Sequence, residues 1–125
     1  MRISLDSRSK ALMAATAASD KKATDIVILD MGPLIGITDY FVICSAPNTR
    51  QVKTIADEVK ERLGASEIKP YRREGERENR WVLLDYLDIV VHIFHEEERE
   101  FYRIENLWQD ADRLPFEEAT RAFGS

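Results

Sequence analysis

The chain has 125 residues, of which 44% are hydrophobic and 33% are charged, and its formal net charge is −5. This length fits one domain with its own core, and the acidic balance argues against a nucleic-acid backbone as the main partner, because phosphate binding requires clustered Lys and Arg. The single cysteine, Cys44, excludes an internal disulfide, and its apolar neighbours predict a buried side chain rather than a reactive thiol.

The N-terminal segment predicts a helix and no targeting signal. Residues 4–19 are rich in alanine, Ser4 is a candidate N-cap, and Leu5, Leu12 and Met13 form a modest apolar stripe. The segment lacks the uninterrupted apolar core of a secretory signal, and no run in the sequence approaches the ~20 apolar residues that span a bilayer. We therefore expect a soluble, cytoplasmic protein without membrane contact.

Two short strands are predicted next. Residues 25–30 form a buried apolar run, and Met31-Gly32-Pro33 ends it, because proline cannot donate to a β-ladder. Residues 40–45 form the second strand, which follows an intervening loop. Both runs are short enough to cross a small sheet once.

The clearest helix is predicted to begin after Asn48. The Asn48 side chain can cap the free backbone amides, and Gln51 follows three residues later, as in a capping box. Gly64 is well placed as the C-terminal cap. One apolar face follows helical spacing and contains Val52, Ile55, Ala56, Val59 and Leu63.

The second half of the chain completes an α/β pattern. We expect a short edge strand over residues 67–71, a solvated loop over 72–80, two strands within 81–95 and a last helix over 97–109. The whole chain, 1–125, is predicted to be a single domain with a mixed β-sheet and flanking helices. Its core covers about 5–112, with a loosely docked tail over 113–125. The stripe of the last helix contains Phe101, Ile104, Leu107 and Trp108.

The two strands within 81–95 predict a hairpin with two different faces. A two-residue loop at Tyr86-Leu87 places Asp85 opposite Asp88 and Trp81 opposite His92. One face is then aliphatic and should pack on helices; it carries Val82, Leu84, Ile89, Val91 and Ile93. The other face combines aromatic and charged side chains, as protein-binding surfaces do. This mixed face carries Trp81, Leu83, Asp85, Asp88, Val90, His92 and Phe94.

Two alternatives remain open for this hairpin. Trp81 and His92 can instead form a purely structural cross-strand pair beneath a loop or the terminal tail. The register also depends on the turn, since a slip of one residue exchanges the faces. Tyr-Leu is a poor sequence for a tight turn, so a longer turn is the alternative.

The histidines and following glutamates do not favour a metal site. His92 and His95 are three residues apart, and on a strand such residues point to opposite faces. Residues 96–98, all glutamates, fit the N-terminus of the last helix, where carboxylates complement the helix dipole. No nucleophile–base pair stands out, so we predict no metal, no cofactor and no catalytic residue.

Several separated motifs lie in the order and approximate spacing of one known family. They are Asp39-Tyr40-Phe41-Val42-Ile43, Arg50-Gln51-Val52, Glu74-Gly75, Trp81, Asp85-Tyr86, Asp88-Ile89-Val90-Val91-His92-Ile93-Phe94, Arg99, Tyr102, Glu105 and Leu107-Trp108. Between Leu12 and Asp112, the chain resembles the ribosomal silencing factor family, also called Iojap-like, on these residues. One departure is Leu87, because the family commonly has glycine there, and it affects the turn of the hairpin.

The resemblance implies a fold similar to nucleotidyltransferases without their activity. Those enzymes place a Gly-Ser pair before paired metal-binding carboxylates, and the only Gly-Ser here is Gly124-Ser125 at the end of the sequence. The resemblance further implies binding to protein number fourteen of the large ribosomal subunit. This binding blocks joining of the small subunit and lowers translation when nutrients are short. An acidic adaptor suits such a basic partner, with little direct nucleic-acid contact.

The residues that match the family's motifs are the candidate partner-binding residues. We expect Trp81 and Tyr102 to supply aromatic contact, and Asp85 and Asp88 to meet Lys or Arg on the partner. His92, Arg99 and Trp108 complete the set.

Two rival functions remain. One is an enzyme similar to nucleotidyltransferases that holds a metal with Asp39, Asp85 and Asp88. The other is a nonribosomal adaptor or a homodimer in which the mixed face pairs with itself. Binding of Mg²⁺ and nucleotide tests the first, and sedimentation with large ribosomal subunits tests the second.

Overall fold

A six-stranded mixed sheet forms the centre of the fold in the computed structural model, which describes residues 5–116. The strands are β1 (Thr24–Asp30), β2 (Tyr40–Ala46), β3 (Arg72–Glu74), β4 (Trp81–Asp85), β5 (Ile89–His95) and β6 (Asp112–Arg113). The helices are α1 (Ser7–Asp20), α2 (Gly32–Ile35), α3 (Thr49–Gly64), α4 (Glu96–Tyr102) and α5 (Ile104–Leu107). The predicted mixed α/β fold class is confirmed.

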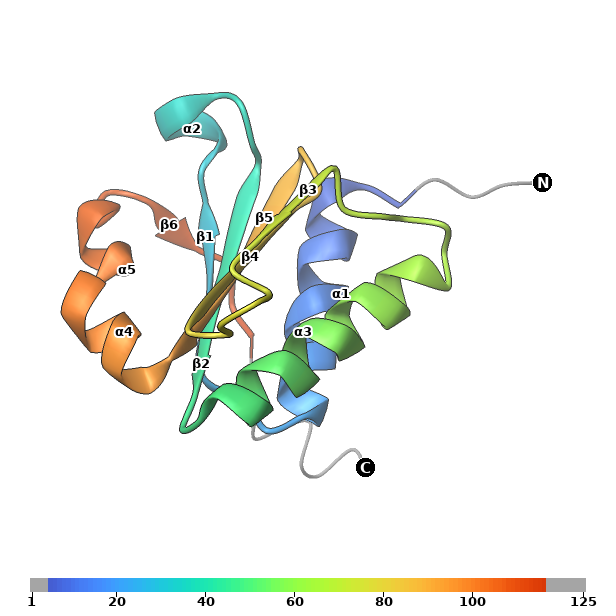
Figure 1. The fold of residues 1–125 in the computed structure, drawn as a ribbon. Coiled ribbons are helices and arrows are strands. Elements are labelled where there is room, and N and C mark those ends of the chain that lie inside the picture. The colour runs from blue at the N-terminus through green and yellow to red at the C-terminus, as the bar shows by residue number, and fades with distance from the viewer. Residues whose placement is uncertain (1–4, 117–125) are drawn as a thin grey trace.

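The sheet order is β3-β4-β5-β2-β1-β6, with β2 and β5 parallel and the other neighbouring pairs antiparallel. Helices α1 and α3 cover one face of the sheet, and α4 and α5 lie on the other (Figure 1). No helix in the described part of the chain is long and apolar enough to cross a membrane.

Helix α1 lies close to the sheet because its buried side is made of alanines. It begins at an N-cap that differs from the prediction: Asp6 accepts a hydrogen bond from the Ser9 amide at 2.8 Å, and Ser4 lies outside the described residues. Small side chains allow the helix backbone to approach its neighbours. The buried alanines are Ala11, Ala14, Ala15, Ala17 and Ala18.

Helix α3 confirms the predicted start and apolar face. Asn48 Oδ1 accepts from the Gln51 amide at 2.8 Å, and the predicted apolar residues are all buried. The Gln51 side chain, however, donates to the Lys21 carbonyl at 2.5 Å, so only half of a capping box is present. Gly64 is the last residue of the helix and not its cap. The left-handed backbone conformation expected of a capping glycine is found at Glu67, which has a φ of 63°.

The predicted edge strand over 67–71 is wrong, because the strand lies at β3, within the segment expected to be a loop. Its three residues are all exposed and pair with β4, with Arg72 opposite Asp85. An edge strand with both faces in solvent needs no apolar residue, so periodicity gave no signal. Gly75 follows with φ of 83°, and a Cβ there would lie 1.9 Å from the Trp81 carbonyl oxygen.

The strands β4 and β5 of the hairpin have the predicted faces and a different register, and Asp88 lies in the turn between them. Trp81 is opposite Phe94, not His92, and Leu84 is opposite Val91, so the pairing is displaced by two residues from the prediction. A displacement of two preserves the alternation of side chains, and the aliphatic face packs on α1 and α3 as expected. The turn is longer than two residues, and Leu87 adopts a φ of 75° in it.

The predicted last helix is broken at Arg103, which has a left-handed φ of 45°. The break separates α4 from α5, so the expected apolar stripe is wrong. Ile104 is buried, whereas Phe101 is 79% exposed and Leu107 is 73% exposed. Beyond α5 the chain pairs with β1 as β6, and Phe116 packs on the core; the chain therefore stays attached to the sheet beyond residue 112.

An aromatic surface beside a buried arginine

The face of the sheet under α4 and α5 carries a group of aromatic and apolar side chains that we call the aromatic surface. Its buried side chains come from β5, its partly buried ones from β2, β4 and the residue after α5, and its exposed ones from the α4–α5 segment. Its members are Phe41, Trp81, His92, Phe94, Phe101, Tyr102, Leu107 and Trp108.

Trp81 and His92 form the polar contact at its centre. The Trp81 indole N–H donates to His92 Nδ1 at 3.2 Å, so the neutral imidazole carries its proton on Nε2. His92 is 3% exposed, and burial lowers its pKa to about 4. Nε2 is buried and has no hydrogen-bond partner among the described residues. His92 is therefore neutral near pH 7 and orients the indole ring.

The remaining rings hold this pair in place. Trp81 stacks on Phe94, with ring centroids 4.8 Å apart and planes inclined by 27°. Phe41 meets His92 edge-on at 4.7 Å and Trp108 at 6.2 Å. Offset and edge-to-face contacts of this kind add to the energy of burial. The surface is therefore built on a packed aromatic base.

The outer part of the aromatic surface is exposed because the helix breaks at Arg103. Tyr102 contacts Trp81 with ring centroids 5.0 Å apart and is 47% exposed, while Phe101 and Leu107 are largely exposed. Glutamates of α4 lie at its border, and Arg80 binds Glu98 through Nε at 2.9 Å. An apolar centre with a charged border is typical of protein-binding sites.

The structure brings together four of the predicted partner-binding residues: Trp81, His92, Tyr102 and Trp108. Asp85 lies at the far end of β4, where Oδ1 accepts from the Leu87 amide at 2.8 Å. Asp88 Oδ2 forms an ion pair with Lys10 of α1 at 2.9 Å. Because α1 covers the opposite face of the sheet, the placement of Asp88 on the mixed face is wrong.

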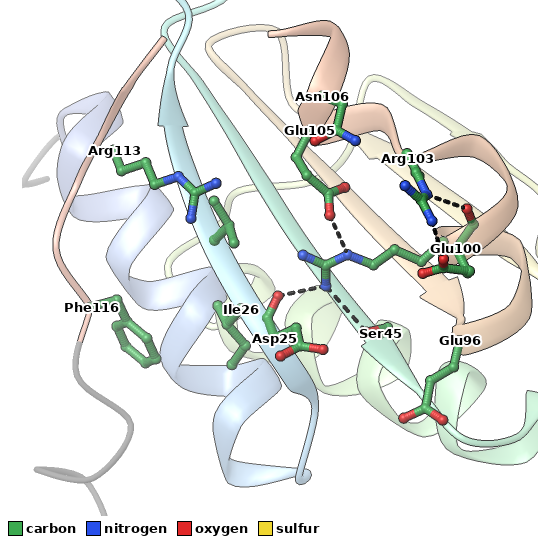
Figure 2. Close-up of a pocket in the computed structure, with 12 residues that line it drawn as sticks. Asp25, Ile26, Ser45, Glu96, Glu100, Arg103, Glu105, Asn106, Arg113 and Phe116 are labelled. Carbon is green, nitrogen blue, oxygen red and sulfur yellow. Dashed lines mark hydrogen bonds and ion pairs between the residues drawn. The ribbon is translucent and has the colours of Figure 1, made fainter. Parts of the chain in front are cut away.

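Arg99 is buried and lies away from the aromatic surface. Its guanidinium donates to the Asp25 carbonyl at 2.5 Å, to Ser45 Oγ at 3.1 Å and to Glu105 at 3.2 Å (Figure 2). These contacts link α4 to β1, β2 and α5. The expectation that Arg99 meets a partner directly is therefore not supported by its position.

The carboxylates of the rival metal site are not arranged as a metal centre. Asp85 and Asp88 have the separate contacts described above, and residues 5–116 contain no group of three or more His, Cys, Asp or Glu side chains placed to hold a metal ion. His95 Nδ1 accepts from the Glu97 amide at 3.1 Å, apart from His92. The buried position of Cys44 agrees with its prediction.

Phe41, Phe101 and Leu107 belong to the surface but were not predicted as partner residues. Phe41 had a usable signal in the alternation of β2. It lies on the same face of the strand as Ile43, and the buried Val42 between them points to the other face. Phe101 and Leu107 had none, since their exposure follows from the left-handed Arg103, a residue type that rarely breaks a helix in this way.

The fold is a small mixed α/β domain whose aromatic surface leaves large apolar side chains in solvent. The chain matches the family described as "Ribosomal silencing factor during starvation" over residues 4–123. It belongs to this ribosomal silencing factor family.

Known relatives and solved structures agree with this assignment. The chain is 46% identical over 99 residues to a ribosomal silencing factor of Bacillus subtilis, covering 79% of this chain and 84% of the relative. It is 35% identical over 109 residues to the chloroplastic protein Iojap of Zea mays, covering 86% of this chain and 47% of that protein. A crystal structure from Chromobacterium violaceum superimposes with a TM-score of 0.81 and 29% identity over 90% of this chain and 92% of that one. A structure from Bacillus halodurans gives a TM-score of 0.74 and 38% identity over 83% and 94% of the respective chains.

Proposed function

We propose that this silencing factor uses its aromatic surface to bind protein number fourteen of the large ribosomal subunit. Bound there, it blocks joining of the small subunit and represses translation under nutrient limitation, acting by binding rather than by catalysis. The observation that carries this proposal is the exposure of Phe101 and Leu107, at 79% and 73%, beside the half-exposed Tyr102. Large apolar side chains that gather in solvent mark interaction sites, and both residues neighbour members of the aromatic surface in the chain, Phe101 next to Tyr102 and Leu107 next to Trp108.

The charges around the surface support a basic partner. The first turn of α4 is formed by the glutamates Glu96, Glu97 and Glu98, and the chain carries a formal net charge of −5. Ribosomal proteins that contact RNA need clustered Lys and Arg, so opposite charges speed encounter and fix orientation. The aromatic side chains then supply most of the binding energy.

The roles of the predicted residues follow from their positions. We assign direct contact to Trp81, Tyr102 and Trp108, and a contact at the far end of β4 to Asp85. His92 acts through Trp81, whose indole it orients at 3.2 Å. Asp88 and Arg99 stabilise the fold through their ion pairs and leave the partner contact to the others.

Sedimentation with purified large ribosomal subunits tests the proposal. We expect the chain to pellet with large subunits and to slow their joining to small subunits. Tyr102→Ala should weaken binding by roughly thirtyfold or more, the cost of truncating a central aromatic anchor (~2–4 kcal/mol). Lys53→Ala is the control, because Lys53 is exposed on α3, which covers the opposite face of the sheet.

The main competing outcome is self-association through the same surface. An exposed apolar surface can equally pair with a second copy of the chain. Sedimentation velocity at increasing protein concentration detects this, and Leu107→Ser should dissociate such a dimer. A chain that dimerises through these residues and stays in the supernatant with large subunits at micromolar concentration and low salt contradicts the silencing proposal.

A further inference from the structure

A second feature on the same side of the sheet is a polar cavity of about 910 Å³. The aromatic surface lies over β4 and β5, whereas the cavity lies between the α4–α5 segment and the strands β1 and β6 (Figure 2). The buried Arg99 forms part of its wall. Arg103, Arg113, Glu100 and Glu105 add further charged groups. Small-molecule sites are concave and hold their ligand with a few convergent polar groups, and here charged groups make up most of the wall.

The buried charges at the cavity are incompletely paired. Arg99 uses Nε and Nη1 for its three hydrogen bonds, and its Nη2 bonds to no described residue. Glu105 accepts through Oε2, while its Oε1 is buried and has no partner in the part of the chain that the structure describes. Arg99 Nη2 is therefore an unused donor at the wall of the cavity, which an acceptor on a ligand would satisfy.

The backbone at the cavity is also irregular. Asp25 has a φ of 50°, and the register between β1 and β2 shifts between Thr24 and Val27. Arg99 holds this bulge by bonding to the Asp25 carbonyl. Bulges and left-handed non-glycine residues cost free energy and are concentrated at binding sites.

Arg113 provides the second accessible guanidinium. It comes from β6 and is exposed, and its guanidinium forms no hydrogen bond or ion pair with the described residues. Figure 2 shows its side chain extending toward the cavity on the side where Glu105 lies. The guanidinium of Arg113 and Nη2 of Arg99 can therefore both donate N–H hydrogen bonds to one carboxylate of a ligand.

The sign of the wall charges selects the kind of ligand. Asp25, Glu96, Glu100 and Glu105 line the cavity together with the three arginines Arg99, Arg103 and Arg113. Glu105 already pairs with Arg99, and Glu100 pairs with Arg103, which leaves Arg113 together with the carboxylates of Asp25 and Glu96. A phosphate would meet both of these carboxylates, whereas a zwitterion can place each of its charges beside an opposite one. Ile26, Val27 and Phe116 add an apolar part to the wall.

We propose that this cavity binds a free α-amino acid with an apolar side chain. Its carboxylate lies between Arg113 and Arg99 Nη2, its ammonium group lies beside the carboxylates of Asp25 and Glu96, and its side chain packs toward Ile26 and Phe116. The site is separate from the aromatic surface and does not depend on the ribosomal role.

Titration calorimetry of the full chain with a panel of standard α-amino acids, led by leucine, tests the proposal. We expect saturable binding of leucine, and binding at least roughly tenfold weaker for leucinamide and N-acetyl-leucine, which lack the carboxylate or the ammonium charge. Inorganic phosphate should not compete. Equal binding of N-acetyl-leucine or phosphate would show a simple anion site and overturn the assignment to a zwitterion.

Variants locate the site. Arg113→Ala should weaken leucine binding by roughly tenfold while the unfolding transition stays unchanged, because Arg113 is exposed. Arg50→Ala, at an exposed arginine of α3 outside the cavity, is the matched control and should bind as the wild type does. Binding of no amino acid at millimolar concentration, or equal affinity in Arg113→Ala, overturns the proposal. No arm uses ribosomal particles, so failure here leaves the silencing role untouched.

Discussion

The two faces of one sheet serve different purposes in this chain. Under α1 and α3, alanines and aliphatic side chains are fully buried and close the face. Under α4 and α5, the cover is short and broken, both tryptophans of the chain lie in the cluster, and large apolar side chains remain in solvent. The first face is closed by its helices, whereas the second leaves apolar side chains in solvent, and this is the face to which we assign the partner. The comparison shows that an apolar surface stays exposed on this sheet because the helices α4 and α5 are too short to cover their face completely.

The strongest test of this difference compares two leucines. Leu84 is fully buried under α1 and α3, whereas Leu107 is 73% exposed on the aromatic surface. Leu84→Ala should cost about 2–5 kcal/mol of unfolding free energy, because it leaves a cavity. Leu107→Ala should change it by less than about 0.5 kcal/mol and should weaken binding to large subunits instead. Urea unfolding and sedimentation measure the two quantities; equal losses of stability would remove the contrast between the faces.

Lowering the pH should act on the aromatic surface through His92. Its pKa falls from 6.5 to about 4 in the folded chain because of burial. Between these values the unfolded state binds more protons, so stability is highest above pH 6.5 and falls as the pH drops toward 4. The full contribution is about 3 kcal/mol. Urea unfolding across this range, repeated with His92→Gln, should show a smaller loss in the variant; identical curves would contradict a buried, neutral His92.

A smaller effect isolates the hydrogen bond at the centre of the aromatic surface. Trp81→Phe keeps an aromatic ring on Phe94 but removes the indole N–H that donates to His92. The expected cost is about 0.5–1.5 kcal/mol, with a change in the His92 nitrogen chemical shifts as the imidazole loses its fixed tautomer. Unchanged nitrogen shifts would mean that Trp81 does not set the protonation of His92.

The smallest expected effect concerns the turn between the faces. Leu87 has a φ of 75°, a conformation that costs a leucine about 1–2 kcal/mol and glycine almost nothing. Leu87→Gly should raise the unfolding free energy by about 0.5–1 kcal/mol after the greater entropy of glycine in the unfolded chain is included. A destabilised variant would show that the exposed leucine side chain contributes contacts that outweigh the strain.

The hairpin shows what the sequence could predict. Its faces followed from alternation, which survives a displacement of two residues, but its register depended on the turn, and a left-handed leucine is not an expected turn residue. The burial of Arg99 was not predictable, because it depends on partners from β1, β2 and α5 that only the fold brings together. The aromatic surface was anticipated at Trp81 and Tyr102 and missed at Phe101, whose exposure follows from the break at Arg103.

The most direct test of the central claim uses the two tryptophans as reporters of the aromatic surface. Because both Trp81 and Trp108 lie there, the chain labelled with 5-fluorotryptophan carries fluorine on this face alone. Unlabelled ribosomal protein number fourteen is then added, and the ¹⁹F spectrum is recorded. We predict that both signals shift or broaden on binding, and that Tyr102→Ala requires much more partner for the same change. Binding detected by calorimetry with both fluorine signals unmoved would contradict the assignment of this face to the partner.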